Sequence, residues 1–425
     1  MSIYDSLNNE QQEAVMYTEG PLLILAGAGS GKTRVLTHRI AYLIEEKEVK
    51  PWNIMAITFT NKAAKELTDR LDSMLGSDMG KDVWASTFHA TCARMLRRNA
   101  DRMGYTSHFT IRDTDDTRRL MKECYKTLDI DDKVLPIRST LSEISRAKDQ
   151  LASPGMYLIQ AEGDGRKKKI AQAYALYQKR LQEADAMDFD DLLMQTVIML
   201  EQNEDVLEYY QNRFHYIMVD EYQDTNEVQN AIFQAVSRDG QNIFTVGDVK
   251  QSIYRFRLAD PTIFLEKYNR FPSWETQRWE SGNPASPKNF RSRREILDAA
   301  NFIFSNILSA EMGEMDYGED EALHFGAEYY PERRDCATEF HLITAWQKSA
   351  EGDQPVKRLA AEARFVAERI RQLLDEGYPV TDGDGTLRPC RPEDIVILMR
   401  SPGSRSAAFA GAGGAGDPLL LRGER

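Results

Sequence analysis

The sequence is poor in the features that mark secreted, metal-binding and membrane proteins. Its four cysteines, Cys92, Cys124, Cys336 and Cys390, lie far apart and form no C-x-x-C pair, so neither a disulfide framework nor a zinc or iron–sulfur site is predicted. No apolar run approaches the length of a membrane span, and the opening MSIYDSLNNEQQ carries no basic or apolar leader. We therefore expect a globular cytoplasmic protein with ordinary thiols and no membrane contact.

Positive charge is also scarce. Lys and Arg number 54 against 67 Asp and Glu, and the formal net charge is −13. A protein that coats nucleic acid by bulk attraction is usually basic, so any contact with DNA is expected to be local. With 425 residues the chain is long enough for several domains and for a cleft between them.

Short apolar runs alternate with helical patterns over the first 110 residues and again after residue 215, which is typical of βαβ units around a parallel sheet. The predicted strands are 21–25 (PLLIL), 54–58 (IMAIT), 82–86 (DVWAS), 216–221 (YIMVDE) and 242–248 (NIFTVGD). Loops at the carboxyl ends of such strands bind ligands in α/β sheets. The fold class expected is therefore α/β.

One helix is predicted in detail between the second and third strands. In NKAAKELTDRLDSML the residues Ala63, Leu67, Leu71 and Leu75 lie four apart on one face, and Asn61 is the expected N-cap. From about residue 113 to 183 the strand signals vanish and charged helical segments dominate. This stretch is predicted to be a helical insertion.

A Pro-, Gly-, Ser- and Asn-rich stretch at 271–290 predicts a linker to a second α/β segment. In that segment we expect helices at 295–308 and 360–377 and strands at 338–344 and 393–401. The last twenty residues turn abruptly to Gly and Ala without periodicity. They are either a flexible tail or the product of a frame error, because codons for GIPCYCG read one base out of frame can spell DPLLLRG.

The stretch AGAGSGKT, residues 26–33, lies between an apolar run and a helical pattern. Small residues let backbone amides wrap a phosphate, and Lys32 supplies charge to the β and γ oxygens while Thr33 holds Mg²⁺. Nucleotide binding is assigned to Gly27, Ala28, Gly29, Ser30, Gly31, Lys32 and Thr33. Ala26 stands where the strict motif has its first glycine, and a chance glycine turn is the alternative.

Two carboxylates close the strand in VDEYQD. In a chain that also has a phosphate-binding loop, the two carboxylates are expected to have different roles. Asp220 holds Mg²⁺ through water, and Glu221 polarises the attacking water. The alternative is a solvated strand end.

In GDVKQSIYRFR, Gln251 follows another strand, where an amide can sense a γ-phosphate. Tyr254, Phe256 and Arg257 then alternate aromatic and cationic groups, which suits stacking and phosphate contact on a single strand. The alternative is a core aromatic cluster with a surface arginine.

In KNFRSRRE, Phe290 stands beside Arg291 at the entrance to the second α/β segment. A ring can stack on adenine while its neighbour reaches the γ-phosphate across a domain cleft, which would couple closure to nucleotide state. A charged helix start is the alternative.

Together these motifs resemble superfamily 1A DNA helicases of the UvrD, Rep and PcrA type, in order over roughly residues 4 to 400. LNNEQQEAV is similar to the adenine-reading Q motif with Gln11, AITFTNKAA to motif Ia, STFHA to motif Ib, and VDEYQD, GDVKQSIYRFR and NFRS to motifs II, III and IV. The first 235 residues look like PcrA, whereas the sequence from about residue 240 looks like the AddA subunit of AddAB helicase-nucleases.

The resemblance implies a single-stranded DNA path. It is lined by Phe59, Asn61, His89, Phe189, Tyr254, Phe256 and Arg257. For Phe189 a core role stays open, because MDFDDLLMQTVIML also reads as an amphipathic helix.

The resemblance also implies a domain plan. A P-loop, RecA-like domain 1A would comprise residues 1–94 and 186–276, helical insertion 1B residues 95–185, a partial RecA-like domain 2A residues 277–405, and an irregular tail residues 406–425. The implied activity is ATP- and Mg²⁺-dependent 3′–5′ movement on single-stranded or duplex DNA in repair or recombination. The alternative is a nucleotide-dependent DNA-binding module without motor activity, because motifs V and VI do not follow residue 400.

Overall fold

The computed structural model describes residues 3–76, 79–238, 240–252, 259–270, 288–309, 311, 316–319, 321–331, 336–343, 358–382 and 385–398. The chain divides into two compact units, unit 1 (residues 1–289) and unit 2 (residues 290–425). Most of the predicted linker, 271–287, and the whole predicted tail from residue 406 lie outside the described residues.

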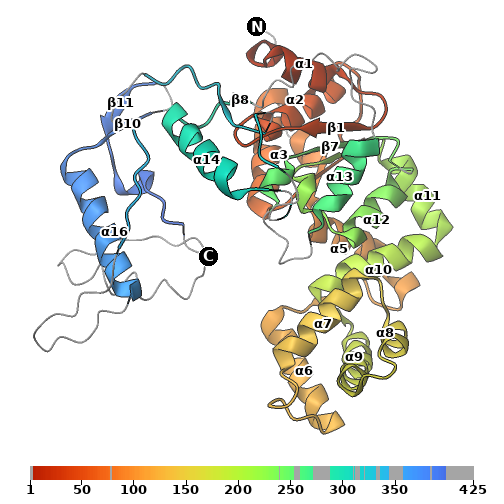
Figure 1. Ribbon diagram of the computed structural model, residues 1–425. Coiled ribbons are helices and arrows are strands. Elements are labelled where there is room, and N and C mark those ends of the chain that lie inside the picture. The colour runs from red at the N-terminus through yellow and green to blue at the C-terminus, as the bar shows by residue number, and fades with distance from the viewer. Residues whose placement is uncertain are drawn as a thin grey trace, which may run out of the picture. The chain divides into compact units, whose positions relative to one another are not determined.

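Unit 1 is built on a five-stranded sheet with the order β1-β7-β6-β2-β3, of which Figure 1 labels β1 and β7. The strands are β1 (Leu22–Leu25), β2 (Ile54–Thr58), β3 (Trp84–Thr87), β6 (Tyr216–Val219) and β7 (Ile243–Gly247). Every neighbouring pair is parallel. The predicted α/β class is confirmed, and each predicted strand begins and ends within two residues of the observed one.

The sheet is covered on both faces, which explains its nearly continuous apolar strands. All five residues of β2 are buried. Alternate residues face opposite ways: Ile54 and Ala56 pack with α2 (Lys32–Glu45) and α3 (Asn61–Leu75). Met55 and Ile57 pack on the other side. The helices there are α5 (Phe88–Arg98), α10 (Phe189–Gln202) and α12 (Glu227–Val236). Among the described residues of unit 1, the other α-helices and strands outside the helical insertion are α1 (Asn9–Met16), α4 (Met79–Asp82), α11 (Glu204–Arg213), α13 (Pro261–Arg270) and the short β8 (Lys288–Asn289).

Helix α3 spans the predicted residues, but its predicted N-cap was wrong. Thr60 is the cap: its backbone is extended and its Oγ1 accepts a hydrogen bond from the Ala63 N–H at 3.1 Å. Asn61 is the first helical residue, because the cap must be the residue whose φ and ψ still lie outside the helix. The buried face consists of Ala64, Leu67 and Leu71.

The predicted helical insertion is confirmed as four helices with a core of their own, which we call the helical lobe. They are α6 (Thr114–Leu128), α7 (Ile137–Asp149), α8 (Pro154–Gln160) and α9 (Gly165–Glu183). Two short parallel strands, β4 (Thr110–Ile111) and β5 (Ala186–Met187), pair where the chain enters and leaves the lobe. Helix α10 packs against α5 and α12 and also contacts α7, so it joins the lobe to the sheet (Figure 1).

Unit 2 contains α14 (Arg294–Ile307), α16 (Arg358–Asp375), the two-residue β9 (His324–Phe325) and a hairpin of β10 (Pro379–Thr381) and β11 (Leu387–Pro389). Both predicted helices are confirmed. The two predicted strands were wrong wherever they are described: residues 338–343 and 395–398 form no strand there. Leu342 and Leu398 are 78% and 91% exposed. An apolar run becomes a strand only when a neighbour pairs with its backbone, and the described residues provide none at these segments.

The four cysteines are free thiols, as predicted. Among the helices within the described ranges, none has the length and apolar character needed to cross a membrane.

A polar contact at the lobe junction predicts a pH effect on stability. Asp149, at the end of α7, accepts a hydrogen bond from Asn226 Nδ2 of α12 at 3.1 Å. Burial and then the charge of Asp190 on α10 raise the pKa of Asp149 from 3.8 to about 7. Because the folded pKa is raised, the stability gained from its bound proton is complete below pH 3.8 and is lost as the pH rises through about 7.

Asp149→Asn keeps the acceptor oxygen for Asn226 and carries no charge at any pH. Between about pH 6 and about pH 8 the parent should therefore lose stability that the variant keeps. The unfolding temperature of the variant minus that of the parent should increase by roughly 2 to 4 °C over this range. Thermal unfolding of both proteins at the two pH values measures it. An identical difference at both pH values would contradict the titration of Asp149 in this range.

Candidate functional site

The loops that follow the five strands of unit 1 leave from the carboxyl edge of the sheet, because all its strands are parallel. Three adjacent strands, β1, β7 and β6, lead into the loop at 26–33, Asp248 to Gln251, and Asp220 with Glu221. The other two, β2 and β3, lead into Phe59 to Asn61 and into His89. The sheet order thus separates the predicted phosphate and magnesium residues, on one half of this edge, from Phe59, Asn61 and His89 on the other.

The glycine-rich loop has the conformation that a phosphate cradle requires. Gly29 and Gly31 have left-handed φ angles of 71° and 93°. A Cβ on Gly29 would lie 2.7 Å from Asn289 Nδ2, and one on Gly31 would lie 3.0 Å from Gln11 Nε2. Gly31 is the N-cap of α2 and makes no side-chain cap hydrogen bond, so the first N–H groups of the helix suit an anion.

Lys32 is linked to the end of β7 by side-chain hydrogen bonds. Its Nζ donates to Gln251 Oε1 at 3.1 Å, and Gln251 Nε2 donates to Asp248 Oδ2 at 2.7 Å. Since Asp248 accepts from the amide nitrogen, the amide oxygen of Gln251 faces Lys32. Lys32, predicted to supply charge to the phosphate, and Gln251, predicted to sense it, lie 219 positions apart in the sequence and are in direct contact.

The carboxylates after β6 lie beside the start of α2. Thr33 Oγ1 donates to Asp220 Oδ2 at 3.3 Å. Burial and then the charge of Glu221 raise the pKa of Asp220 to about 6, although Lys32 acts against this shift. Glu221 has a left-handed φ of 53°. This conformation is uncommon for a residue other than glycine and is found preferentially at functional positions.

Thr33 and Asp220 are suited to Mg²⁺. This ion is commonly bound by one or two protein oxygens together with phosphate oxygens and water. The hydroxyl and carboxylate oxygens lie 3.3 Å apart, and a buried carboxyl with a raised pKa is stabilised in its charged form by a nearby cation. Over the described ranges, no group of three or more His, Cys, Asp or Glu residues suits a metal ion.

Gln11 lies against the phosphate loop from α1. Its Nε2 donates to the Ser30 carbonyl at 2.9 Å, while its Oε1 accepts from the Asn8 N–H at 3.2 Å as part of a capping box. Phe290 and Arg291 belong to unit 2, where their carbonyls accept hydrogen bonds from Tyr329 and Tyr330 at 2.8 Å. Their roles toward adenine and the γ-phosphate stay predictions.

On the other half of the edge, two of the predicted DNA residues meet. Phe189 is the first residue of α10, and its ring lies 5.7 Å from that of His89 in an edge-to-face arrangement. Phe189 is 49% exposed. Phe59 and Asn61 follow β2, partly exposed and exposed respectively. Tyr254, Phe256 and Arg257 lie outside the described residues.

Sequence reasoning missed two side chains at this site. Asp248 fixes the amide of Gln251, and Asn289 Nδ2 donates to the Ala28 carbonyl at 2.8 Å in the phosphate loop. Both lie inside motifs already singled out, GDVKQ and KNFRS. The available signals were that Asp248 ends the predicted strand 242–248 and that Asn289 directly precedes Phe290.

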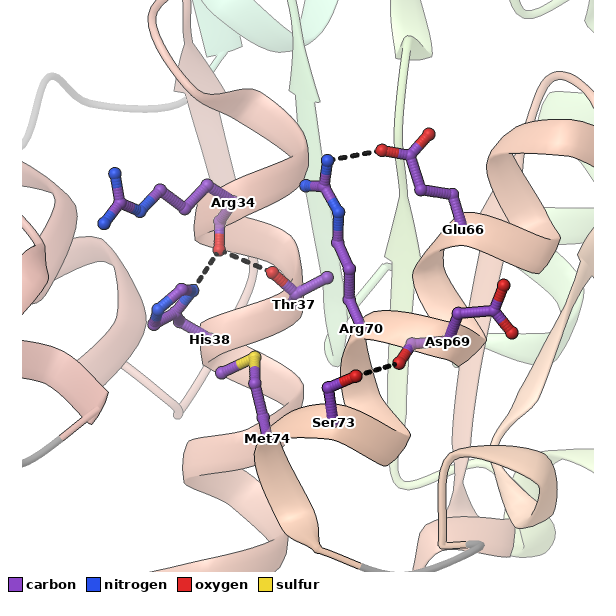
Figure 2. Close-up of a pocket in the computed structure, with 8 residues that line it drawn as sticks. All are labelled: Arg34, Thr37, His38, Glu66, Asp69, Arg70, Ser73 and Met74. Carbon is purple, nitrogen blue, oxygen red and sulfur yellow. Dashed lines mark hydrogen bonds and ion pairs between the residues drawn. The ribbon is translucent and has the colours of Figure 1, made fainter. Parts of the chain in front are cut away.

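A pocket of about 460 Å³ lies between α2 and α3, away from these residues (Figure 2). Its lining is Arg34, Thr37, His38, Glu66, Asp69, Arg70, Ser73 and Met74. Arg70 pairs with Glu66 one turn away on α3, and the acidic and basic side chains of the lining are mixed. No predicted site residue lines this pocket.

Comparison with known proteins finds relatives over most of the chain. The family profile described as UvrD/REP helicase N-terminal domain matches residues 7–272. The chain is 41% identical over 405 residues to the ATP-dependent DNA helicase PcrA of Bacillus subtilis (strain 168), covering 94% of this chain and 53% of that protein. It is 45% identical over 305 residues to the PcrA proteins of Staphylococcus aureus (strain Mu50) and Staphylococcus epidermidis, covering 72% of this chain and 40% and 41% of theirs. The chain thus spans about half the length of these relatives or less.

Proposed function

Because the chain belongs to the UvrD/REP helicase family, we propose that it carries the nucleotide-hydrolysing and DNA-gripping part of an ATP-dependent DNA translocase. The observation that carries the proposal is the order of the sheet. The phosphate loop, Gln251 and the carboxylates follow β1, β7 and β6, while Phe59, Asn61 and His89 of the predicted DNA path follow the adjoining β2 and β3 along the same edge. A change at the γ-phosphate can therefore reach the DNA side through neighbouring strands about 4.8 Å apart.

In the proposed reaction a water attacks the γ-phosphorus of ATP, the bond to the bridging oxygen breaks, and ADP leaves. Glu221 orients the water and takes its proton, and Lys32 stabilises charge on the phosphate oxygens. Gln251 senses the γ-phosphate through Lys32, because the ammonium group that contacts the phosphate also donates to the Gln251 amide oxygen. Mg²⁺ held by Thr33 and Asp220 would neutralise charge on the β and γ oxygens.

The remaining assignments belong to the same proposal. Gln11 and Phe290 read adenine, and Arg291 completes the nucleotide site from unit 2. Single-stranded DNA contacts the predicted path, comprising Phe59, Asn61, His89, Phe189, Tyr254, Phe256 and Arg257. Unit 1 corresponds to RecA-like domain 1A with helical lobe 1B, and unit 2 to part of domain 2A. Movement is 3′ to 5′ in cytoplasmic DNA repair or recombination.

ATP hydrolysis by this chain, measured with and without a single-stranded oligonucleotide, tests the proposal. We expect turnover that rises with DNA concentration, because both sites share one edge of the sheet. ATP binding without turnover at any DNA concentration would overturn the translocase reading in favour of a nucleotide-dependent DNA-binding module. A blunt duplex of the same length is the matched control and should stimulate less.

A further inference from the structure

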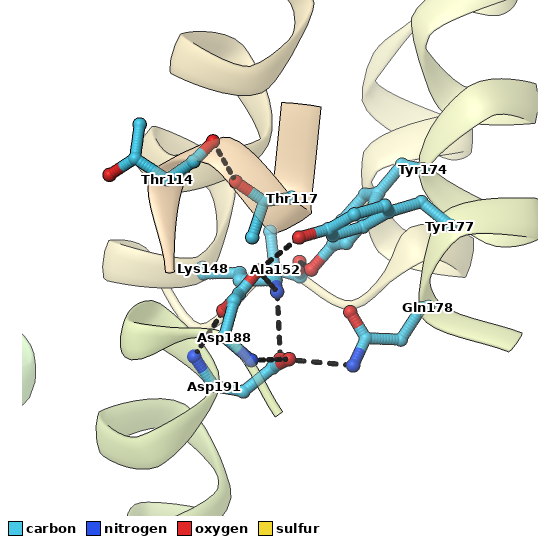
Figure 3. A network of polar contacts seen from close by, with 9 residues as sticks. All are labelled: Thr114, Thr117, Lys148, Ala152, Tyr174, Tyr177, Gln178, Asp188 and Asp191. Atoms are coloured by element: carbon cyan, nitrogen blue, oxygen red, sulfur yellow. Dashed lines mark hydrogen bonds and ion pairs between the residues drawn. The ribbon is translucent and has the colours of Figure 1, made fainter. Parts of the chain in front are cut away.

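A buried network of charges joins the helical lobe to the start of α10 (Figure 3). Lys148, near the end of α7, has a fully buried side chain, and its Nζ lies 2.6 Å from Asp188 Oδ2 and 2.8 Å from Asp191 Oδ1. Burying three ionised groups costs several kcal/mol each unless every charge is paired. Packing alone therefore does not explain why these three charged groups are buried together.

Every oxygen of the two carboxylates has a donor. The Tyr177 hydroxyl donates to Asp188 Oδ2 at 2.9 Å, and Gln178 Nε2 donates to Asp191 Oδ1 at 2.9 Å, both from α9. The remaining two oxygens cap α10. Asp188 Oδ1 accepts from the Asp191 N–H at 2.8 Å, and Asp191 Oδ2 accepts from the Asp188 N–H at 3.1 Å. Two helices of the lobe thus hold the first turn of a third helix.

The residue that follows Asp188 is Phe189, whose half-exposed ring meets His89. The network therefore ends one residue away from a ring that the proposed function assigns to DNA. Because each carboxylate oxygen meets its own donor, the network favours one geometry of the first turn of α10. Apolar contacts alone would allow the helix to shift along or around its axis.

We propose that Lys148 and Tyr177 are positioning residues for single-stranded DNA: they hold the start of α10 so that Phe189 presents its ring to a base. This inference rests on the proposed function, because it requires Phe189 to contact DNA. The helical lobe then contributes to the DNA site through α10.

The test is a double-mutant cycle in the full chain, read out as affinity for a fluorescent single-stranded oligonucleotide. Tyr177→Phe removes one hydroxyl from Asp188 and leaves the Lys148 pairs in place. Tyr174→Phe is the matched control, because this hydroxyl is also buried on α9 but donates to the Ala152 carbonyl at 3.1 Å. Phe189→Ala, alone and combined with Tyr177→Phe, completes the cycle.

We expect Tyr177→Phe to weaken DNA binding roughly threefold in the parent and to have no effect in the Phe189→Ala background. Tyr174→Phe should leave DNA affinity unchanged, although it should lower the unfolding temperature about as much as Tyr177→Phe does. The KM for ATP without DNA should be unchanged in all of these variants, which a general loss of structure would not allow.

Two outcomes overturn the inference in distinguishable ways. If Phe189→Ala weakens DNA binding but Tyr177→Phe does not, the network is only structural and the proposed DNA path stands. If Phe189→Ala has no effect, the ring lies off the path, and the assignment of Phe189 under the proposed function fails together with the inference.

Discussion

Replacing Lys32 with alanine should lower ATP turnover by about a hundredfold to a thousandfold, since a preorganised charge at the transferring phosphate is lost. Lys32 Nζ is held 3.1 Å from Gln251 Oε1, and Gln251 is held in turn by Asp248. The charge is thus fixed at the phosphate loop before the nucleotide arrives. Because the lysine acts on charge that develops during hydrolysis, kcat should fall more than nucleotide affinity.

Steady-state hydrolysis with saturating single-stranded DNA, combined with nucleotide binding by fluorescence, measures both effects. Lys179→Ala is the matched control: this lysine is 70% exposed on α9 and pairs only with Glu183 among the ion pairs described. It should keep parental turnover. Turnover of Lys32→Ala within about twofold of the parent would show that the loop at 26–33 does not perform the hydrolysis.

The strands and the phosphate loop could be predicted because their signals are local. A buried parallel strand is a continuous apolar run, and the loop requires small residues at fixed spacing. The order β1-β7-β6-β2-β3 could not be predicted in this way, because it depends on which strands pair across long connections. That order is what separates the phosphate loop and the carboxylates from Phe59, Asn61 and His89 along the edge.

The helical lobe shows more clearly which contacts cannot be predicted from the sequence. Within ISRAKDQ, Lys148 looks like an ordinary surface lysine of a charged helix, and sequence reasoning did not single it out. Its partner Asp188 lies 40 residues further along, so only the tertiary fold reveals the pair. Phe189 shows the same limit. The sequence left core and DNA roles open, and its half exposure beside His89 favours the second as a proposal.

The N-cap of α3 was predicted one residue too late because two neighbouring residues both suit that position. Thr60 and Asn61 are both good N-cap residues, and sequence alone does not say which of two neighbours keeps an extended backbone. The choice follows from where β2 ends, at Thr58, and how the chain turns after it.

Replacing Lys148 with methionine should destabilise unit 1 by about 3 to 5 kcal/mol, because the carboxylates of Asp188 and Asp191 would stay buried without their cation. Methionine fills a similar volume, so the loss measures charge and not a cavity. The unfolding temperature should fall by roughly 6 to 12 °C. Lys179→Met, an exposed lysine in the same lobe, should change stability by no more than about 0.5 kcal/mol.

A triple variant separates the charge effect from packing. When Asp188→Asn and Asp191→Asn accompany Lys148→Met, no unpaired charge remains, while asparagine can still cap α10. Thermal unfolding followed by circular dichroism should then recover most of the lost stability. If the triple variant is as unstable as Lys148→Met alone, the buried charges are not the cause, and the junction depends on the shape of the lysine side chain instead.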